Sequence, residues 1–200
     1  MAKNAKRKKP VGAKAGWKRC KTKIRFKNKV FALREDKIEL PGGKRKRFAY
    51  MERTDAVIIV PVTRDGELVL INQYRYSVDQ WCLEVPAGGT HDKPNDSLKG
   101  VARAELREET GGRCRSLTYV DYLFSASSLT DEKCHVFLAE GVVLSEKPEK
   151  EAMEKIEVKL VPAKKALALV HAGKMKDGQC ALAILLREPL LRKKGYVGVR

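Results

Sequence analysis

Two apolar runs joined by a very short turn place the strongest constraint on the fold of this chain. AVIIVPVT at 56–63 and ELVLINQY at 67–74 are rich in β-branched residues, and only Arg64, Asp65 and Gly66 separate them. Asp-Gly between such runs is a strong hairpin signal, and a connection this short cannot make the crossover that parallel neighbours need. The runs are therefore expected to be antiparallel neighbours, and the first to be buried on both faces because it is apolar throughout.

The rest of the chain mixes strand and helix patterns. Helices are expected from an Asn95 or Asp96 cap to residue 110, from Pro162 to Gly173, and over 179–193. Further strand-like runs occupy 116–126, 133–143 and 155–161. This mixture predicts an α+β or mixed-sheet class rather than a doubly wound parallel sheet.

Shorter strand patterns precede the apolar hairpin. VFALREDKIEL at 30–40 and KRKRFAYME at 44–52 flank a Pro-Gly-Gly turn at 41–43. Two β-type runs around a glycine turn indicate a small antiparallel sheet. We therefore predict a small N-terminal sheet region over 21–53, followed by the main domain over 54–200.

Positive charge is concentrated at the start of the chain. Fourteen Lys or Arg residues precede the first acid, Glu35, and the net charge of the whole chain is +17 while that of the remainder is only +3. Residues 1–20 are expected to be a disordered basic leader. Such a leader can contact nucleic acid through phosphates, or it can be a solvated tail that only raises solubility.

The cysteines and the apolar runs indicate a compartment. The five cysteines form no C-x-x-C pair, and no apolar run approaches the eighteen residues that a membrane span needs. No apolar stretch follows the first basic residues, as a secretory signal would require. A protein of the reducing cytoplasm, with no membrane association, is expected.

Three carboxylates are expected on one face of the helix that ends near residue 110. Glu105, Glu108 and Glu109 have the spacing i, i+3 and i+4. Crowded carboxylates repel and raise each other's pKa unless a hard cation such as Mg²⁺ or Mn²⁺ lies between them. The alternative is a solvated acidic face on which Arg103 and Arg107 are the partners.

The sequence around this helix resembles the Nudix hydrolase family. Residues 84–112, EVPAGGTHDKPNDSLKGVARAELREETGG, carry the second half of the family motif, and NQYRYSVDQWCLEVPAG at 72–88 is similar to the subgroup that hydrolyses ADP-ribose and other nucleoside diphosphate sugars. The resemblance implies an α/β/α Nudix fold. It also implies that water attacks the pyrophosphate of a nucleotide-sugar substrate, giving a nucleoside monophosphate and a sugar phosphate.

The resemblance assigns roles to the acidic residues. Glu105 and Glu109 would bind Mg²⁺ (or Mn²⁺) directly, Glu108 would bind the metal or support its ligands, and the Ala87 carbonyl would complete the coordination. The general base of the subgroup corresponds to Glu132, although helix carboxylates serve in other branches of the family. The alternative for Glu132 is an ordinary exposed loop acid.

The resemblance also implies substrate contacts and a homodimer. Arg75 would bind phosphate, or instead form a salt bridge with Glu84 or Asp79; Glu84 would bind a sugar hydroxyl or the loop, or be a structural strand acid. Members of the subgroup are often dimers in which the N-terminal sheet helps to build the nucleoside pocket of the partner. Phe31 and Phe48 are therefore candidates to stack on a base, with core packing as the alternative.

Three departures from the family motif weaken these assignments. Ala104 stands where the motif has Arg, so that Arg103 or Arg107 would have to orient the carboxylates. The stretch between Gly88 and Glu105 is two residues longer than the motif allows, with Asp96 near the upstream Glu position. The loop at 126–132 retains Thr130 and Glu132 but lacks the Pro and Gly of the subgroup.

These departures and the leader keep other functions open. A Nudix-fold protein whose site has decayed could bind RNA through the basic leader. An enzyme that removes the nucleotide cap of RNA would combine the leader with the same metal site.

Overall fold

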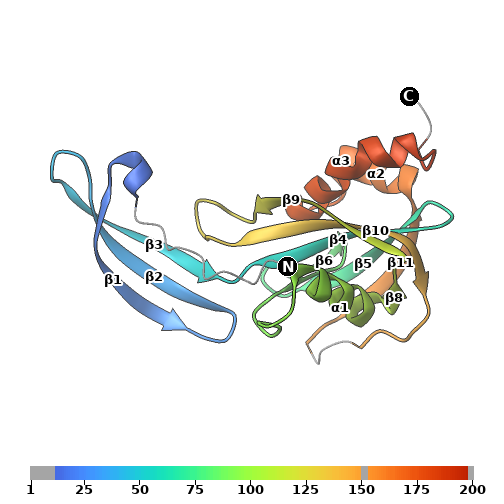
Figure 1. Cartoon of the computed structure of the whole chain (residues 1–200), viewed down its shortest axis with the longest axis horizontal. Helices are drawn as coiled ribbons and strands as arrows, with labels where there is room; N and C mark the ends of the chain where they lie inside the picture. Colours follow the sequence, from blue (N-terminus) through green and yellow to red (C-terminus); the bar gives the residue numbers. More distant parts are fainter. Residues whose placement is uncertain (1–11, 150–152, 198–200) are drawn as a thin grey trace.

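The computed structural model describes residues 12–149 and 153–197 of the chain and contains two β-sheets and three α-helices there (Figure 1). The strands of the smaller sheet are β1 (Lys18–Lys27), β2 (Phe31–Glu39) and β3 (Arg45–Arg53). Those of the larger sheet are β4 (Ala56–Thr63), β5 (Glu67–Arg75), β6 (Gln80–Glu84), β7 (Ala87–Gly89), β8 (Gly112–Arg113), β9 (Ser116–Phe124), β10 (Lys133–Leu144) and β11 (Ile156–Pro162). The helices are α1 (Leu98–Thr110), α2 (Ala163–His171) and α3 (Gly178–Lys193), and a 3-10 turn covers Ala13–Ala15.

The larger sheet is mixed, as predicted. Its path runs β11-β5-β4-β10-β8, with β6 paired to β5, β7 to β4, and β9 to β10. Strands β4 and β10 are parallel, whereas β4 pairs antiparallel with β5 at Val62 and Leu68 and with β7 at its other end. The predicted antiparallel pairing of the two apolar runs is therefore confirmed.

Helices cover both faces of the larger sheet and divide its core in two. On one face Ile59 of β4 packs in an apolar cluster with Leu106 of α1 and Phe137 of β10. On the other face Val60 packs in a second cluster with Ile184 of α3. Neighbouring residues of one strand thus serve opposite clusters, and the expected burial of this strand on both faces and the α/β/α arrangement are confirmed.

The helix ends lie within two residues of their predicted positions. Helix α1 is capped by Ser97, whose hydroxyl accepts a hydrogen bond from the Gly100 amide, and not by Asn95 or Asp96. It ends, as predicted, at Gly111, which has a φ of 69° that favours glycine. Helix α2 stops at His171, two residues before Gly173. None of the helices in the described ranges is long and apolar enough to cross a membrane.

The three-stranded antiparallel sheet lies at one end of the molecule, away from the helices (Figure 1). Strands β2 and β3 flank the predicted turn, and β1 adds a third strand that begins at Lys18. Residues 1–11 of the predicted leader lie outside the described residues. Its remaining part, however, includes the 3-10 turn and the start of β1.

Candidate active site

A cleft of about 860 Å³ lies beside β7 and brings together residues that are far apart in the sequence. Its walls come from the end of β3, the start of β4, the β5–β6 hairpin, the start of β10 and the start of α3. Four of the predicted site residues line it: Arg75, Glu84, Ala87 and Glu132. Glu105, Glu108, Glu109, Phe31 and Phe48 are not among its lining residues.

Two helix carboxylates contact the backbone of β7, the strand that lines this cleft. The Ala87 amide donates a hydrogen bond of 3.0 Å to Oε2 of Glu109. A Cβ atom at Gly88 would collide with the carboxylate of Glu105, so glycine is required for this close approach. Glu105 and Glu109 therefore lie directly behind the strand that lines the cleft.

The buried position of these two carboxylates disfavours their ionised forms. Burial raises the pKa of Glu109 well above its usual range, and the nearby charge of Glu105 raises it further. Burial also raises the pKa of Glu105, although Lys93 opposes this shift. A cation bound at these two carboxylates would favour their ionised forms.

A lysine that the sequence pattern does not mark lies beside Glu105 and Glu108. The Lys93 ammonium lies 2.9 Å from Oε1 of Glu105 and 2.9 Å from Oε2 of Glu108. Over residues 12–149 and 153–197, no three His, Cys, Asp or Glu side chains converge in the arrangement of a metal site. The three helix acids share one face as predicted, but Glu109 turns to the β7 backbone while the other two bind Lys93.

The donor set nevertheless fits a hard divalent cation. Carboxylate and carbonyl oxygens are the ligands that Mg²⁺ takes in proteins, and Glu105, Glu108 and Glu109 supply the former. Gly88 leaves room at the Glu105 carboxylate that any side chain would fill. A cation already binds two of these acids, which indicates that their oxygens can share one positive centre.

Arg75 and Glu84 form a bidentate ion pair in the cleft. Nε and Nη2 of Arg75 lie 2.9 Å and 2.5 Å from the two carboxylate oxygens of Glu84. The Glu84 side chain is 2% exposed, whereas that of Arg75 is 42% exposed. The salt bridge to Glu84 that was considered as an alternative is therefore present, and it fixes the guanidinium plane at the cleft surface.

Glu132 is buried and paired rather than exposed. Its residue is 4% exposed, and Nε of Arg53 lies 3.2 Å from its Oε1. Nη1 of the same arginine lies 3.3 Å from Oε2. The alternative of an ordinary exposed loop acid is wrong, because the end of β3 covers this carboxylate and supplies its counter-charge.

Comparison with known proteins identifies the family. The NUDIX domain model matches residues 52–179. The chain is 34% identical over 173 residues to an ADP-ribose pyrophosphatase of Bacillus subtilis, covering 84% of this chain and 92% of that enzyme. The chain belongs to the Nudix family.

Further similarities agree with this assignment. An ADP-ribose pyrophosphatase of Mycobacterium tuberculosis is 32% identical over 120 residues, which cover 60% of this chain and 58% of that enzyme. The crystal structure of an ADP compounds hydrolase superposes with a TM-score of 0.78 at 23% identity and covers 90% of this chain and 97% of that one. The structural match confirms the Nudix fold predicted from the sequence.

Within this Nudix chain the two candidate base-stacking residues lie apart. Phe48 pairs across the strands with Asp36, which is five residues from Phe31 in the same strand, so the two phenylalanines point to opposite faces of the small sheet. Phe31 contacts Phe26, with ring centroids 5.6 Å apart. One chain therefore cannot use both rings at one site.

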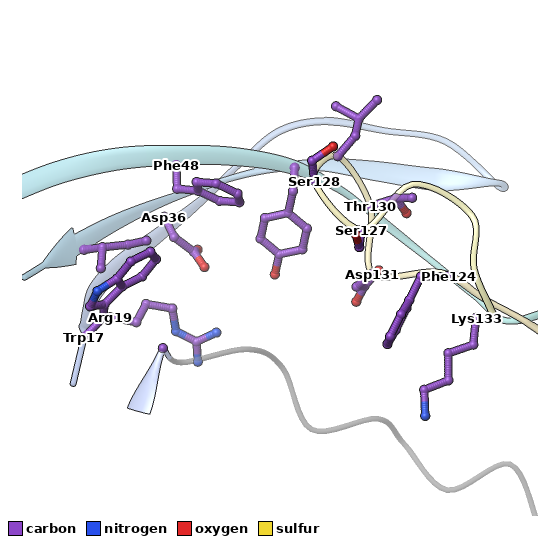
Figure 2. Close-up of a pocket in the computed structure, with 14 residues that line it drawn as sticks. Trp17, Arg19, Asp36, Phe48, Phe124, Ser127, Ser128, Thr130, Asp131 and Lys133 are labelled. Carbon is purple, nitrogen blue, oxygen red and sulfur yellow. The ribbon is translucent and has the colours of Figure 1, made fainter. Parts of the chain in front are cut away.

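Phe48 lines a second cavity of about 420 Å³ between the small sheet and the loop that precedes β10. Figure 2 shows Phe48 and Trp17 at one end of this cavity and Phe124 at the other. Asp36, only 4% exposed, also faces it and accepts a hydrogen bond from Thr22. This cavity is separate from the cleft that holds Arg75 and Glu132.

Of the two candidate substitutes for the missing motif arginine, Arg107 contacts a helix carboxylate and Arg103 does not. Nη1 of Arg103 lies 3.4 Å from the carbonyl oxygen of Cys114, away from the carboxylates. Nη2 of Arg107 lies 3.5 Å from Oε1 of Glu108, whereas Lys93 is at 2.9 Å from the other oxygen of the same group. The closer partner of Glu108, Lys93, thus comes from the loop between β7 and α1. The two extra residues of this loop, relative to the Nudix motif, are the sequence feature that could have indicated it.

Proposed function

We propose that this Nudix enzyme hydrolyses the pyrophosphate bond of ADP-ribose or a related nucleoside diphosphate sugar, releasing a nucleoside monophosphate and a sugar phosphate. The observation that carries the proposal is the position of the helix carboxylates behind β7, at the edge of a cleft that also holds Arg75 and Glu132. The two relatives named as ADP-ribose pyrophosphatases support the choice of substrate class. Neither the cleft nor these relatives favour the RNA-related alternatives.

Glu105, Glu108, Glu109 and the Ala87 carbonyl would hold Mg²⁺, with Mn²⁺ as a substitute. When bound, the cation neutralises pyrophosphate charge and lowers the pKa of a water molecule. The Ala87 amide holds the Glu109 carboxylate in place through its hydrogen bond. Gly88 allows Glu105 to approach the same strand.

Glu132 is the proposed general base and Arg75 the proposed phosphate ligand. Burial behind Arg53 keeps the Glu132 carboxylate in one orientation, ready to accept a proton from the attacking water. Glu84 holds the guanidinium of Arg75 through two hydrogen bonds, so the exposed part of Arg75 faces the cleft in a fixed plane. Glu84 thus acts as a positioning residue for Arg75, and a sugar hydroxyl is its second proposed partner.

We further propose a cytoplasmic homodimer. The small sheet leaves large apolar side chains partly exposed, such as Ile24 (53% exposed) and Phe26 (51% exposed). A second copy packed on this sheet would bury them and would place Phe31 or Phe48 near the partner's substrate. All five cysteines are free thiols, which suits a reducing compartment. In this scheme the predicted leader, 1–20, is shortened to the residues before Lys18, where β1 begins; the small sheet, predicted over 21–53, makes the dimer, and 54–200 is the catalytic domain.

Product analysis tests the proposed reaction. Purified protein with Mg²⁺ is incubated with ADP-ribose, ADP-glucose, GDP-mannose and UDP-glucose, and the products are separated by anion-exchange chromatography. Release of AMP and ribose phosphate from ADP-ribose is expected. If the folded protein released no nucleoside monophosphate from any of the four with Mg²⁺ or Mn²⁺, the proposal would be wrong.

A further inference from the structure

The Lys93 ammonium occupies the position between two of the proposed metal ligands. It lies 2.9 Å from both Glu105 and Glu108 and 3.3 Å from Asp92, and its side chain is 18% exposed. An ammonium has three N–H donors, and three carboxylates surround this one. Within the described part of the chain, Lys93 is the only cation that the structure pairs with Glu105.

The loop that carries Lys93 allows its side chain to leave Glu105 and Glu108. Lys93 belongs to the lengthened loop between β7 and α1, where its neighbours His91, Asp92 and Pro94 are all exposed. The Lys93 carbonyl accepts one hydrogen bond, of 3.1 Å, from the Asp96 amide in the same loop. The long lysine side chain can therefore turn toward solvent without breaking contacts in either apolar cluster.

We propose that Lys93 is an internal counter-ion that competes with the divalent cation for Glu105 and Glu108. The proposal rests on the proposed function, because it takes these carboxylates as the metal site. An oxygen that binds the lysine ammonium is less available to a metal, so cation entry displaces Lys93 from the carboxylates. The lysine lowers the affinity for metal and stabilises the carboxylate cluster while metal is absent.

This competition predicts opposite effects of Lys93 on the two states of the protein. Without metal, removal of the lysine leaves buried carboxylates that repel one another, so the fold is less stable. With metal present, no ammonium has to be displaced from Glu105 and Glu108 in the variant, so the variant binds the metal more tightly. A lysine that merely tied down the loop would stabilise both states alike.

Mn²⁺ binding to Lys93→Met measures the competition directly. Free Mn²⁺ is followed by electron paramagnetic resonance during titration of wild type and variant, without any substrate. We expect about tenfold tighter binding by Lys93→Met. Lys99→Met is the matched control, because Lys99 is an exposed lysine on α1 that forms no ion pair with any of the described residues; its Kd should equal that of wild type.

Thermal unfolding with and without Mn²⁺ provides the second readout. The increase in Tm on adding Mn²⁺ should be larger for Lys93→Met than for wild type, and the metal-free variant should have the lower Tm. If Lys93→Met failed to fold, Lys93→Gln, which keeps a polar side chain, would be titrated in its place.

The outcomes separate this inference from the proposed function. Equal or weaker Mn²⁺ binding by the lysine variants, with binding by wild type intact, would overturn the competition alone. No Mn²⁺ binding by any of the proteins would overturn both the competition and the metal site. Tighter binding by Lys93→Met would support the competition, even if ADP-ribose proved not to be a substrate.

Discussion

The two sheets of this molecule are built on opposite plans. In β4 of the larger sheet the six central residues are buried, whereas in β1 of the smaller sheet none is. The larger sheet has helices on both faces, whereas none of the three α-helices of the described chain lies on the smaller sheet (Figure 1). The helix-covered sheet thus holds the carboxylates and most of the cleft lining, whereas the small sheet contributes Arg53 at the cleft wall and leaves many of its apolar side chains half exposed.

The largest effect is expected from Glu109→Gln in α1, the helix that packs on the larger sheet. The amide keeps an oxygen that can accept the Ala87 hydrogen bond but removes the charge proposed to hold the cation, so hydrolysis should fall by about a thousandfold or more. Steady-state release of AMP from ADP-ribose measures the loss. A variant as active as wild type would remove Glu109 from the proposed metal site.

The same variant has a stability effect of defined sign. Burial and then the charge of Glu105 raise the pKa of Glu109 in the fold, so the folded state binds the proton more tightly than the unfolded state. Without metal, wild-type stability should therefore fall as pH rises from the unfolded pKa through the folded one. Glu109→Gln lacks this loss and should have the higher Tm at pH 7 in chelator, with the advantage disappearing near pH 4. A lower Tm at pH 7 would contradict the assigned burial cost.

The stability of the two sheets can be compared with one matched pair of substitutions. Ile59→Ala, at a fully buried position of β4, should cost about 2–5 kcal/mol in the free energy of unfolding. Ile24→Ala, at an exposed position of β1, should cost about 0.5 kcal/mol or less in the isolated chain. Urea denaturation of both proteins gives the two values. A large cost at Ile24 would mean that its side chain is buried in the assembled protein, which would support the homodimer.

A smaller effect is expected at the face of the small sheet. If Phe48 stacks on a substrate base, Phe48→Ala should raise the KM for ADP-ribose about threefold to tenfold with little change in kcat. Phe31→Ala is the comparison, because that ring points to the other face. Equal effects of the two variants would contradict a role for one face only, and no effect of Phe48→Ala would remove it from the substrate site.

The smallest effect is expected from the leader. Removal of residues 1–11 keeps β1 whole, so hydrolysis and Tm should change by less than the error of either measurement. Retention on immobilised RNA at low salt should fall, because binding of basic residues to phosphate is electrostatic and weakens as salt rises. A loss of hydrolysis on truncation would instead give the leader a part in the substrate site.

The sequence predicted those features that depend on local pattern. The hairpin at Asp65 and Gly66, the burial of β4 and the single face of the three helix acids follow from spacing alone, and the structure has them. The N-terminal end of α1 was misplaced because three polar residues in a row can cap a helix, and only the backbone geometry selects Ser97.

The contacts that the sequence pattern did not indicate depend on tertiary structure. Arg53 meets Glu132 across 79 residues, and Lys93 reaches Glu105 only because a longer loop folds back over α1. No periodicity marks such pairs. The opposite facing of Phe31 and Phe48 depends on the β2–β3 register, which a glycine turn of uncertain type does not fix.

Three hydrogen bonds join the segment before Glu132 to β3, and they determine how fast the amide hydrogens involved exchange with solvent. The Met51 amide donates to the Leu129 carbonyl at 2.8 Å, the Asp131 amide donates to the Met51 carbonyl at 3.4 Å, and the Arg53 amide donates to the Asp131 side chain at 3.0 Å. An opening that frees Glu132 must break these bonds together, so the three amides should exchange deuterium at a common rate. That common rate would measure how often the segment before β10 separates from β3.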